Sequence, residues 1–179
     1  MMNLLSILSK GLLFIFLSVS LHLTVAYVFP FPYHTANSII AMCVLYLFWK
    51  QQGNVVWLAF FSFLFIELYT AQPFGFHIAA GTLGTLISYW ISRYILTQRS
   101  WYSLLAIAAA ASIAYRVLYL ACLLVFHVFI DTLILPPAKT ILTLYTIELG
   151  MTASLVMLLF FLSYPFKNRF LSNTRLSSL

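Results

Sequence analysis

Long apolar runs, interrupted only by short polar turns, constrain this chain more than any other feature of its sequence. The longest run extends from Trp101 to about Ile130. A membrane-spanning helix needs about 20 mainly apolar residues, so runs of this kind are long enough to cross a bilayer. Only 7% of the residues are charged, whereas a soluble domain carries about 25%. The sequence therefore predicts an all-α integral membrane protein that forms a single domain.

Polar or proline-containing turns divide the apolar sequence into six predicted transmembrane helices. The turns lie at Pro30–Pro32, Lys50–Asn54, Thr70–Pro73, Thr97–Ser100 and Asp131–Lys139. The predicted spans cover approximately residues 11–29, 35–49, 55–69, 74–96, 101–130 and 140–164. A short basic tail, residues 165–179, follows the last span and contains no acidic residue.

The basic residues predict how the six helices are oriented in the membrane. With the N-terminus inside, the outer segments hold only Lys139, whereas the inner segments hold Lys10, Lys50, Arg93, Arg99, Lys167, Arg169 and Arg175. Positive charge accumulates on the cytoplasmic side of membrane proteins, so we expect both termini and the basic tail to lie in the cytoplasm. The net charge of +6 does not indicate nucleic-acid binding, because these residues are scattered singly at helix ends.

Three ionisable side chains stand out inside the predicted spans, where an unpaired charge costs about 2.5–3.5 kcal/mol on insertion scales. Arg116 lies near the middle of the fifth span, and Glu67 and Glu148 lie in the outer halves of the third and sixth. We expect Arg116 to pair with one or both carboxylates, which would hold these helices together. With His77, these residues form a candidate polar cluster that is either structural or a site for a ligand or partner.

The sequence contains no recognisable motif for catalysis, for a cofactor or for a metal. It has no Gly-x-Ser-x-Gly segment and no glycine-rich phosphate loop. Its four histidines lack the spacing that places two ligands on one helix face. Cys43 and Cys122 both fall in apolar runs, so we expect no disulfide. These patterns favour a non-enzymatic protein without a cofactor.

Small residues predict a close contact between the fourth and fifth spans. The fourth span presents Ala80, Gly81, Gly84 and Ser88, and the fifth contains the run Ala108–Ala111. Small side chains let helix backbones approach closely in lipid. We therefore expect these helices to pack on each other, or the small face of the fourth span to meet a second copy or a partner protein.

The segment joining the third and fourth spans resembles the signature of the rod shape-determining protein MreD family. It reads Glu67-Leu-Tyr-Thr-Ala-Gln-Pro-Phe-Gly-Phe-His77. The family pattern ends one helix with Asp-Leu-x-Ser and opens the next with a hydrophobe-Gly pair, so Glu67 and Thr70 replace the usual Asp and Ser. Pro73 and Gly75 suit a tight outer turn. A carboxylate at Glu67 could cap the helix that follows.

The resemblance implies a non-enzymatic scaffold of the cell-elongation machinery in the bacterial inner (cytoplasmic) membrane. Such a scaffold would bind the membrane-anchored protein MreC, and through it the MreB filament and the peptidoglycan synthases that build the cell wall. The same length and number of spans also resemble the substrate-binding component of an energy-coupling-factor vitamin transporter. In that case Glu67, His77, Arg116 and Glu148 would line an outward-facing pocket. The bulky first span lacks the Ala-x-x-x-Ala pattern with which such components dock.

Overall fold

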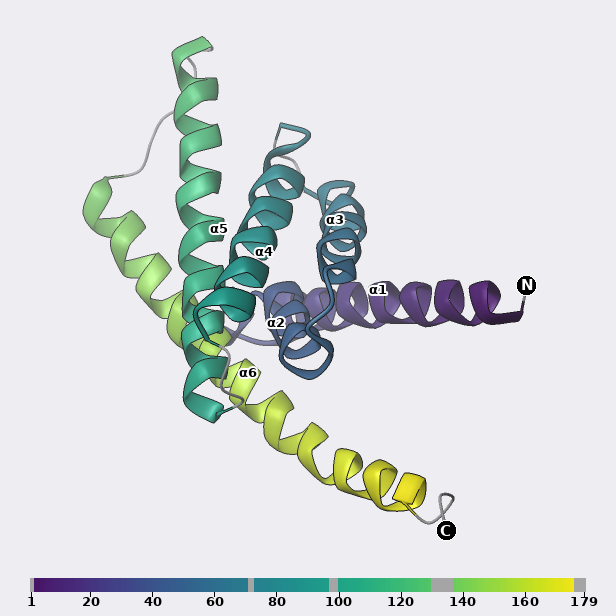
Figure 1. The fold of residues 1–179 in the computed structure, drawn as a ribbon. Helices are drawn as coiled ribbons and strands as arrows, with labels where there is room; N and C mark the ends of the chain where they lie inside the picture. The colour runs from purple at the N-terminus through teal and green to yellow at the C-terminus, as the bar shows by residue number, and fades with distance from the viewer. Residues whose placement is uncertain (1, 71–72, 97–99, 130–136, 176–179) are drawn as a thin grey trace.

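The computed structural model of the protein describes residues 2–70, 73–96, 100–129 and 137–175, and their regular secondary structure is entirely helical. Within these ranges it contains no strand (Figure 1). The helices are α1 (Met2–Val28), the 3-10 helix η1 (Tyr33–Thr35), α2 (Ser38–Lys50), α3 (Asn54–Glu67), α4 (Phe76–Tyr94), α5 (Trp101–Phe129) and α6 (Ala138–Arg175). The all-α prediction is therefore confirmed.

Three of the described helices are long and apolar enough to cross a membrane. These stretches are Ser9–Val28 in α1, Trp101–Phe126 in α5 and Lys139–Ser163 in α6. Helices α2 and α3 are apolar but shorter, with 13 and 14 residues. Each predicted span overlaps one observed α-helix, with shifted ends: α1 begins upstream of residue 11, and α6 continues into the predicted basic tail. Most of the predicted turns at 97–100 and 131–139 lies outside the described residues.

The ends of α2 show how short polar residues set helix boundaries in this apolar chain. The Asn37 side chain accepts a hydrogen bond from the Ile40 backbone N–H at 3.2 Å, and this N-cap starts the helix later than the predicted residue 35. The Asn37 backbone N–H donates to Thr152 Oγ1 of α6 at 3.0 Å. At the other end Gln51 adopts the left-handed conformation, with φ of 49°, and terminates the helix.

Helix α4 lies between α3 and α5 at the centre of the molecule (Figure 1). Helix α6 runs obliquely past α5 and α2, and its C-terminal half extends away from the other helices. Helix α1 runs across the group at a steep angle to α5, with its N-terminal half projecting outwards. Since transmembrane helices tilt by about 20° on average, α1 and α5 can both span only if at least one of them is strongly tilted.

The small-residue face of α4 is buried inside this arrangement. Ala80, Gly81, Gly84 and Ser88 are all buried. A Cβ atom added to Gly81 would overlap the ring of Phe63 on α3, and one added to Gly84 would come within 3.1 Å of the Tyr115 backbone nitrogen on α5. This face of α4 therefore packs against both α3 and α5. The sequence predicted a contact with the fifth span alone, or with another chain.

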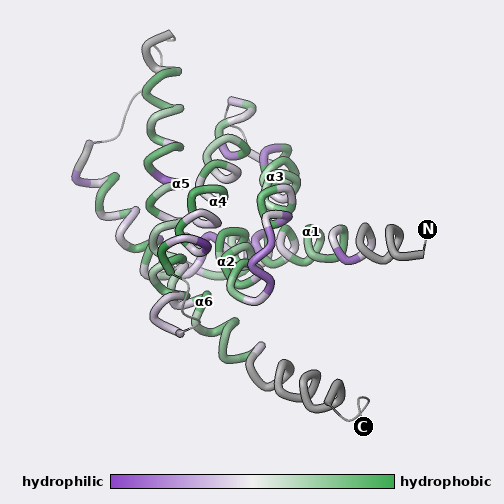
Figure 2. The backbone as a smooth tube through the Cα atoms, viewed as in Figure 1, coloured by the Kyte–Doolittle hydropathy of each residue, from purple (hydrophilic) through white to green (hydrophobic). Residues whose placement is uncertain are grey.

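The outer surface of the helices is largely apolar, as expected of a protein surrounded by lipid. Phe16 on α1, Val117 on α5 and Leu142 on α6 are 74%, 60% and 67% exposed. Figure 2 shows hydrophobic residues along much of α1, α5 and the first part of α6. Such extensive apolar exposure is rare on soluble monomers and marks surfaces that contact a membrane or another protein.

Candidate polar site between the helices

The turn between α3 and α4 is organised by the buried carboxylate of Glu67, which is 3% exposed. Its Oε1 accepts a hydrogen bond from the Gly75 backbone N–H, and its Oε2 accepts one from the Ile78 N–H, each at 3.0 Å. Gly75 has φ of 105°, which favours glycine. Thr70 Oγ1 donates to the Glu67 carbonyl at 3.1 Å. Glu67 thus caps α4 from a distance, where the helix dipole favours a negative charge.

Replacing Glu67 with alanine is expected to lower the free energy of unfolding by about 2 kcal/mol, at the upper end of the range for a lost cap. The change leaves the first N–H groups of α4 without their acceptor in a buried place. Thermal unfolding of the purified protein in detergent would measure the loss. Thr70→Val is the matched control, because it removes only one neutral hydrogen bond of the same turn. Equal melting temperatures for Glu67→Ala and the wild type would contradict the capping role.

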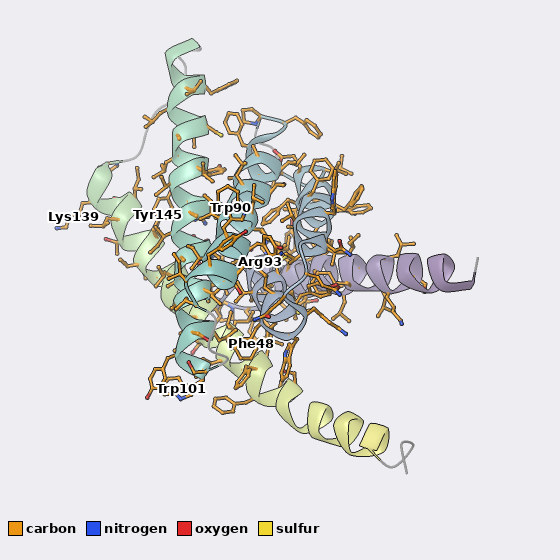
Figure 3. The ribbon with its side chains drawn as sticks, in the orientation of Figure 1. Phe48, Trp90, Arg93, Trp101, Lys139 and Tyr145 are labelled. Atoms are coloured by element: carbon orange, nitrogen blue, oxygen red, sulfur yellow. The ribbon has the colours of Figure 1, made fainter. Side chains whose placement is uncertain are left out.

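Arg116 on α5 pairs with Glu148 on α6, and this contact joins the middle of α5 to the first third of α6. The guanidinium carbon also lies over three tyrosine rings, 4.8 Å from the centroid of Tyr145, 5.2 Å from that of Tyr115 and 5.7 Å from that of Tyr119. Figure 3 shows Tyr145 on α6. The electron-rich ring faces attract the cation in addition to the carboxylate. Glu148 is 4% exposed, so its carboxylate is removed from water.

His77 at the start of α4 extends the polar site toward α5. Its Nδ1 lies 2.8 Å from the Tyr115 hydroxyl, and its ring is 5.0 Å from that of Tyr119. Tyr115 is itself 3% exposed and stacks on Phe63 of α3, with 5.6 Å between ring centroids. His77 is therefore held against the tyrosines that surround Arg116.

A cavity of about 370 Å³ opens beside these residues. Its polar lining includes His22 of α1, His34 of η1, His77, Arg116, Tyr145 and Glu148. Its apolar lining includes Ala26, Phe63, Ile66 and Leu144. Ligand pockets commonly have volumes of about 300–1,000 Å³ and combine apolar walls with a few convergent polar groups. The cavity has the size and lining of such a pocket.

The structure brings together three of the four residues of the predicted polar cluster. His77, Arg116 and Glu148 line the cavity, and Arg116 pairs with Glu148. Glu67 is not among the lining residues, because its carboxylate is turned to the backbone of α4. The four residues singled out in the predicted turn, Glu67, Thr70, Pro73 and Gly75, all lie between α3 and α4 or at their ends. Glu67 bonds to Thr70 and to Gly75, and Gly75 is the N-cap residue of α4.

Sequence reasoning missed the tyrosines of the site. Tyr115 and Tyr119 lie on either side of Arg116 in the sequence, and the two tyrosines are four residues apart, which places them on one face of the helix. Tyr145 precedes Glu148 by three residues. An aromatic ring three residues from an intramembrane arginine, as Tyr119 is from Arg116, was the available signal. The described residues contain no group of three or more His, Cys, Asp or Glu side chains placed to hold a metal ion.

Comparisons with known proteins do not assign the chain to a family. No protein-family model matches it, and no curated protein and no solved structure matches it.

Proposed function

We propose that the chain is a multi-pass protein of the bacterial inner membrane and a non-enzymatic scaffold of the cell-elongation machinery, similar to MreD. The observation that carries the proposal is the α3–α4 turn. The residues that resemble the MreD signature converge there, with Glu67 bonded to the backbones of Gly75 and Ile78. A buried corner of this kind explains why a carboxylate, a hydroxyl and a glycine are needed at this spacing. The corner thus gives the motif a structural role that requires no catalysis.

In the proposed scaffold, six spans place both termini in the cytoplasm. Its partners would be a membrane protein of the MreC type and peptidoglycan synthases. The apolar sides of α1, α5 and α6 offer surfaces that contact lipid or these partners. Figure 3 places Trp101 at the lower end of α5 and Lys139 at the left edge of the helix group. The outer position proposed for Lys139 and the inner one proposed for Trp101 rest on the distribution of basic residues along the sequence.

Affinity purification of the tagged protein from its own host in mild detergent, followed by mass spectrometry, tests the scaffold role. We expect recovery of an MreC-type protein together with a wall synthase. An unrelated multi-pass protein with the same tag is the control for nonspecific capture. Recovery of neither partner above that control would contradict the scaffold role.

The cavity favours a second candidate, the substrate-binding component of an energy-coupling-factor transporter. Such a component needs a pocket among its helices, and His77, Arg116 and Glu148 line one here. In the same purification, this candidate predicts recovery of a paired ATPase and its membrane coupler in place of wall-synthesis proteins.

Cysteine labelling tests the proposed orientation. In a background with Cys43 and Cys122 replaced by alanine, we expect a membrane-impermeant maleimide added outside cells to label Ile134→Cys and to leave Gln52→Cys unlabelled. Both positions fall in turns predicted from the sequence, on opposite sides of the membrane. Labelling after cell lysis is the control for reactivity at both positions. Labelling of position 52 alone in intact cells would reverse the orientation.

A further inference from the structure

Two residues that line the cavity, Arg116 and His22, each have a buried nitrogen atom whose hydrogen-bonding capacity is unused. Arg116 Nε and His22 Nδ1 have no hydrogen-bond partner among the described residues. Both side chains line the cavity, although they come from different helices, α5 and α1. Leaving a buried polar atom unpaired costs about 1–3 kcal/mol, so an uncompensated pair of this kind is unusual in a folded protein.

The groups around the cavity favour an anion over a cation. Arg116 Nε always carries a hydrogen, and a histidine ring nitrogen donates in one tautomer and in the protonated ring. Three histidines and one arginine line the cavity, whereas its only carboxylate among the described residues, Glu148, already pairs with Arg116. A carboxylate or phosphate oxygen accepts hydrogen bonds from such donors more strongly than a neutral oxygen does.

The remainder of the cavity lining is suited to an apolar body. Ala26, Phe63, Ile66 and Leu144 contribute carbon surface, and Tyr115 and Tyr145 add ring faces. The volume of about 370 Å³ exceeds what a bare inorganic anion would fill. We propose that this cavity binds a molecule carrying a carboxylate or phosphate on an apolar or aromatic body, with the oxyanion received by the side chains of Arg116 and His22.

This chemistry has two possible sources, a soluble organic anion and the phosphate of a membrane lipid. Phenyl phosphate represents the first, and phosphatidylglycerol represents the second. Isothermal titration of the detergent-purified full chain measures the binding of phenyl phosphate, with inorganic phosphate at equal ionic strength as the comparison. Native mass spectrometry after release from nanodiscs measures retained phosphatidylglycerol against phosphatidylcholine.

The decisive variant is His22→Leu, because it removes one receiving nitrogen and leaves the Arg116–Glu148 pair in place. We expect it to raise the Kd for phenyl phosphate, or to lower phosphatidylglycerol retention, by about tenfold, the effect of losing one charge-assisted hydrogen bond. The matched control is Arg93→Gln. Arg93 lines a separate cavity of about 310 Å³ with Leu47 and Gln51, so its loss should leave binding unchanged.

The two binding measurements distinguish a soluble ligand from a lipid phosphate. Saturable phenyl phosphate binding that weakens in His22→Leu supports a soluble ligand, and selective phosphatidylglycerol retention that weakens in the same variant supports a lipid phosphate. Binding of neither probe, or equal binding by the wild type and His22→Leu, overturns the proposal. Size-exclusion profiles and far-ultraviolet circular dichroism must match between the two proteins, which excludes misfolding as the cause. The proposal is independent of the scaffold role, which the affinity purification tests by itself.

Discussion

Replacing Arg116 with alanine is expected to lower the free energy of unfolding by about 3–5 kcal/mol, the usual cost of removing one partner from a buried ion pair. The change leaves Glu148, which is 4% exposed, without its cation. It also removes the contacts of the guanidinium with three tyrosine rings. The folded yield in detergent and the thermal unfolding midpoint would both fall.

The two carboxylates provide a matched pair of second-site changes. Arg116→Ala with Glu148→Gln should recover part of the lost stability, because the uncompensated charge is gone. Arg116→Ala with Glu67→Gln should recover none, since Glu67 serves the N-terminus of α4. Rescue by Glu67→Gln instead of Glu148→Gln would show that the pairing described here is wrong.

Replacing Gly81 with leucine is expected to cost about 3 kcal/mol or more, at or beyond the upper end for overpacking a core. A Cβ atom alone at this position would overlap the Phe63 ring, which is 2% exposed and stacked on Tyr115. The ring has little room to move, so α3 and α4 must separate. Thermal unfolding in detergent would record the loss.

Gly150 on α6 is the matched control for this substitution. It lies inside a helix, as Gly81 does, but a Cβ atom there would meet nothing within 4 Å. Gly150→Leu should therefore be neutral or slightly stabilising, because glycine disfavours helix by about 1 kcal/mol. Combining Gly81→Leu with Phe63→Ala should recover stability. Equal losses from Gly81→Leu and Gly150→Leu would contradict the close contact of α3 and α4.

The helical segments were predictable from the sequence because each is a run of apolar residues bounded by polar or proline-containing turns. Their ends depended on local hydrogen bonds that composition does not show. Asn37 delays α2, and Glu67 starts α4 at Phe76 instead of residue 74. The cost of intramembrane charge identified Arg116, Glu67 and Glu148. This cost could not show which of the two acids pairs with Arg116, because Glu67 is taken up by backbone N–H groups of α4 whose direction the sequence does not reveal.

The crosswise course of α1 and the contact between Tyr145 and Arg116 could not be predicted from the sequence, for a different reason. Hydrophobic length predicts that a segment is an apolar helix but not its angle to its neighbours, which side-chain packing decides. Likewise, the contact between Tyr145 of α6 and Arg116 of α5 depends on how two helices cross, which no local pattern in the sequence records.

Tyr115 gives the helix contacts and the cavity a common residue. Its backbone limits the space at Gly84, its ring stacks on Phe63, and its hydroxyl meets His77. A molecule that bound beside it would therefore act on the spacing of α3, α4 and α5. Thermodynamic linkage makes such an effect reciprocal: a ligand that tightened this spacing would bind more weakly to any variant that loosened it. Occupancy of the cavity and the distance between helices would then be two measures of one equilibrium.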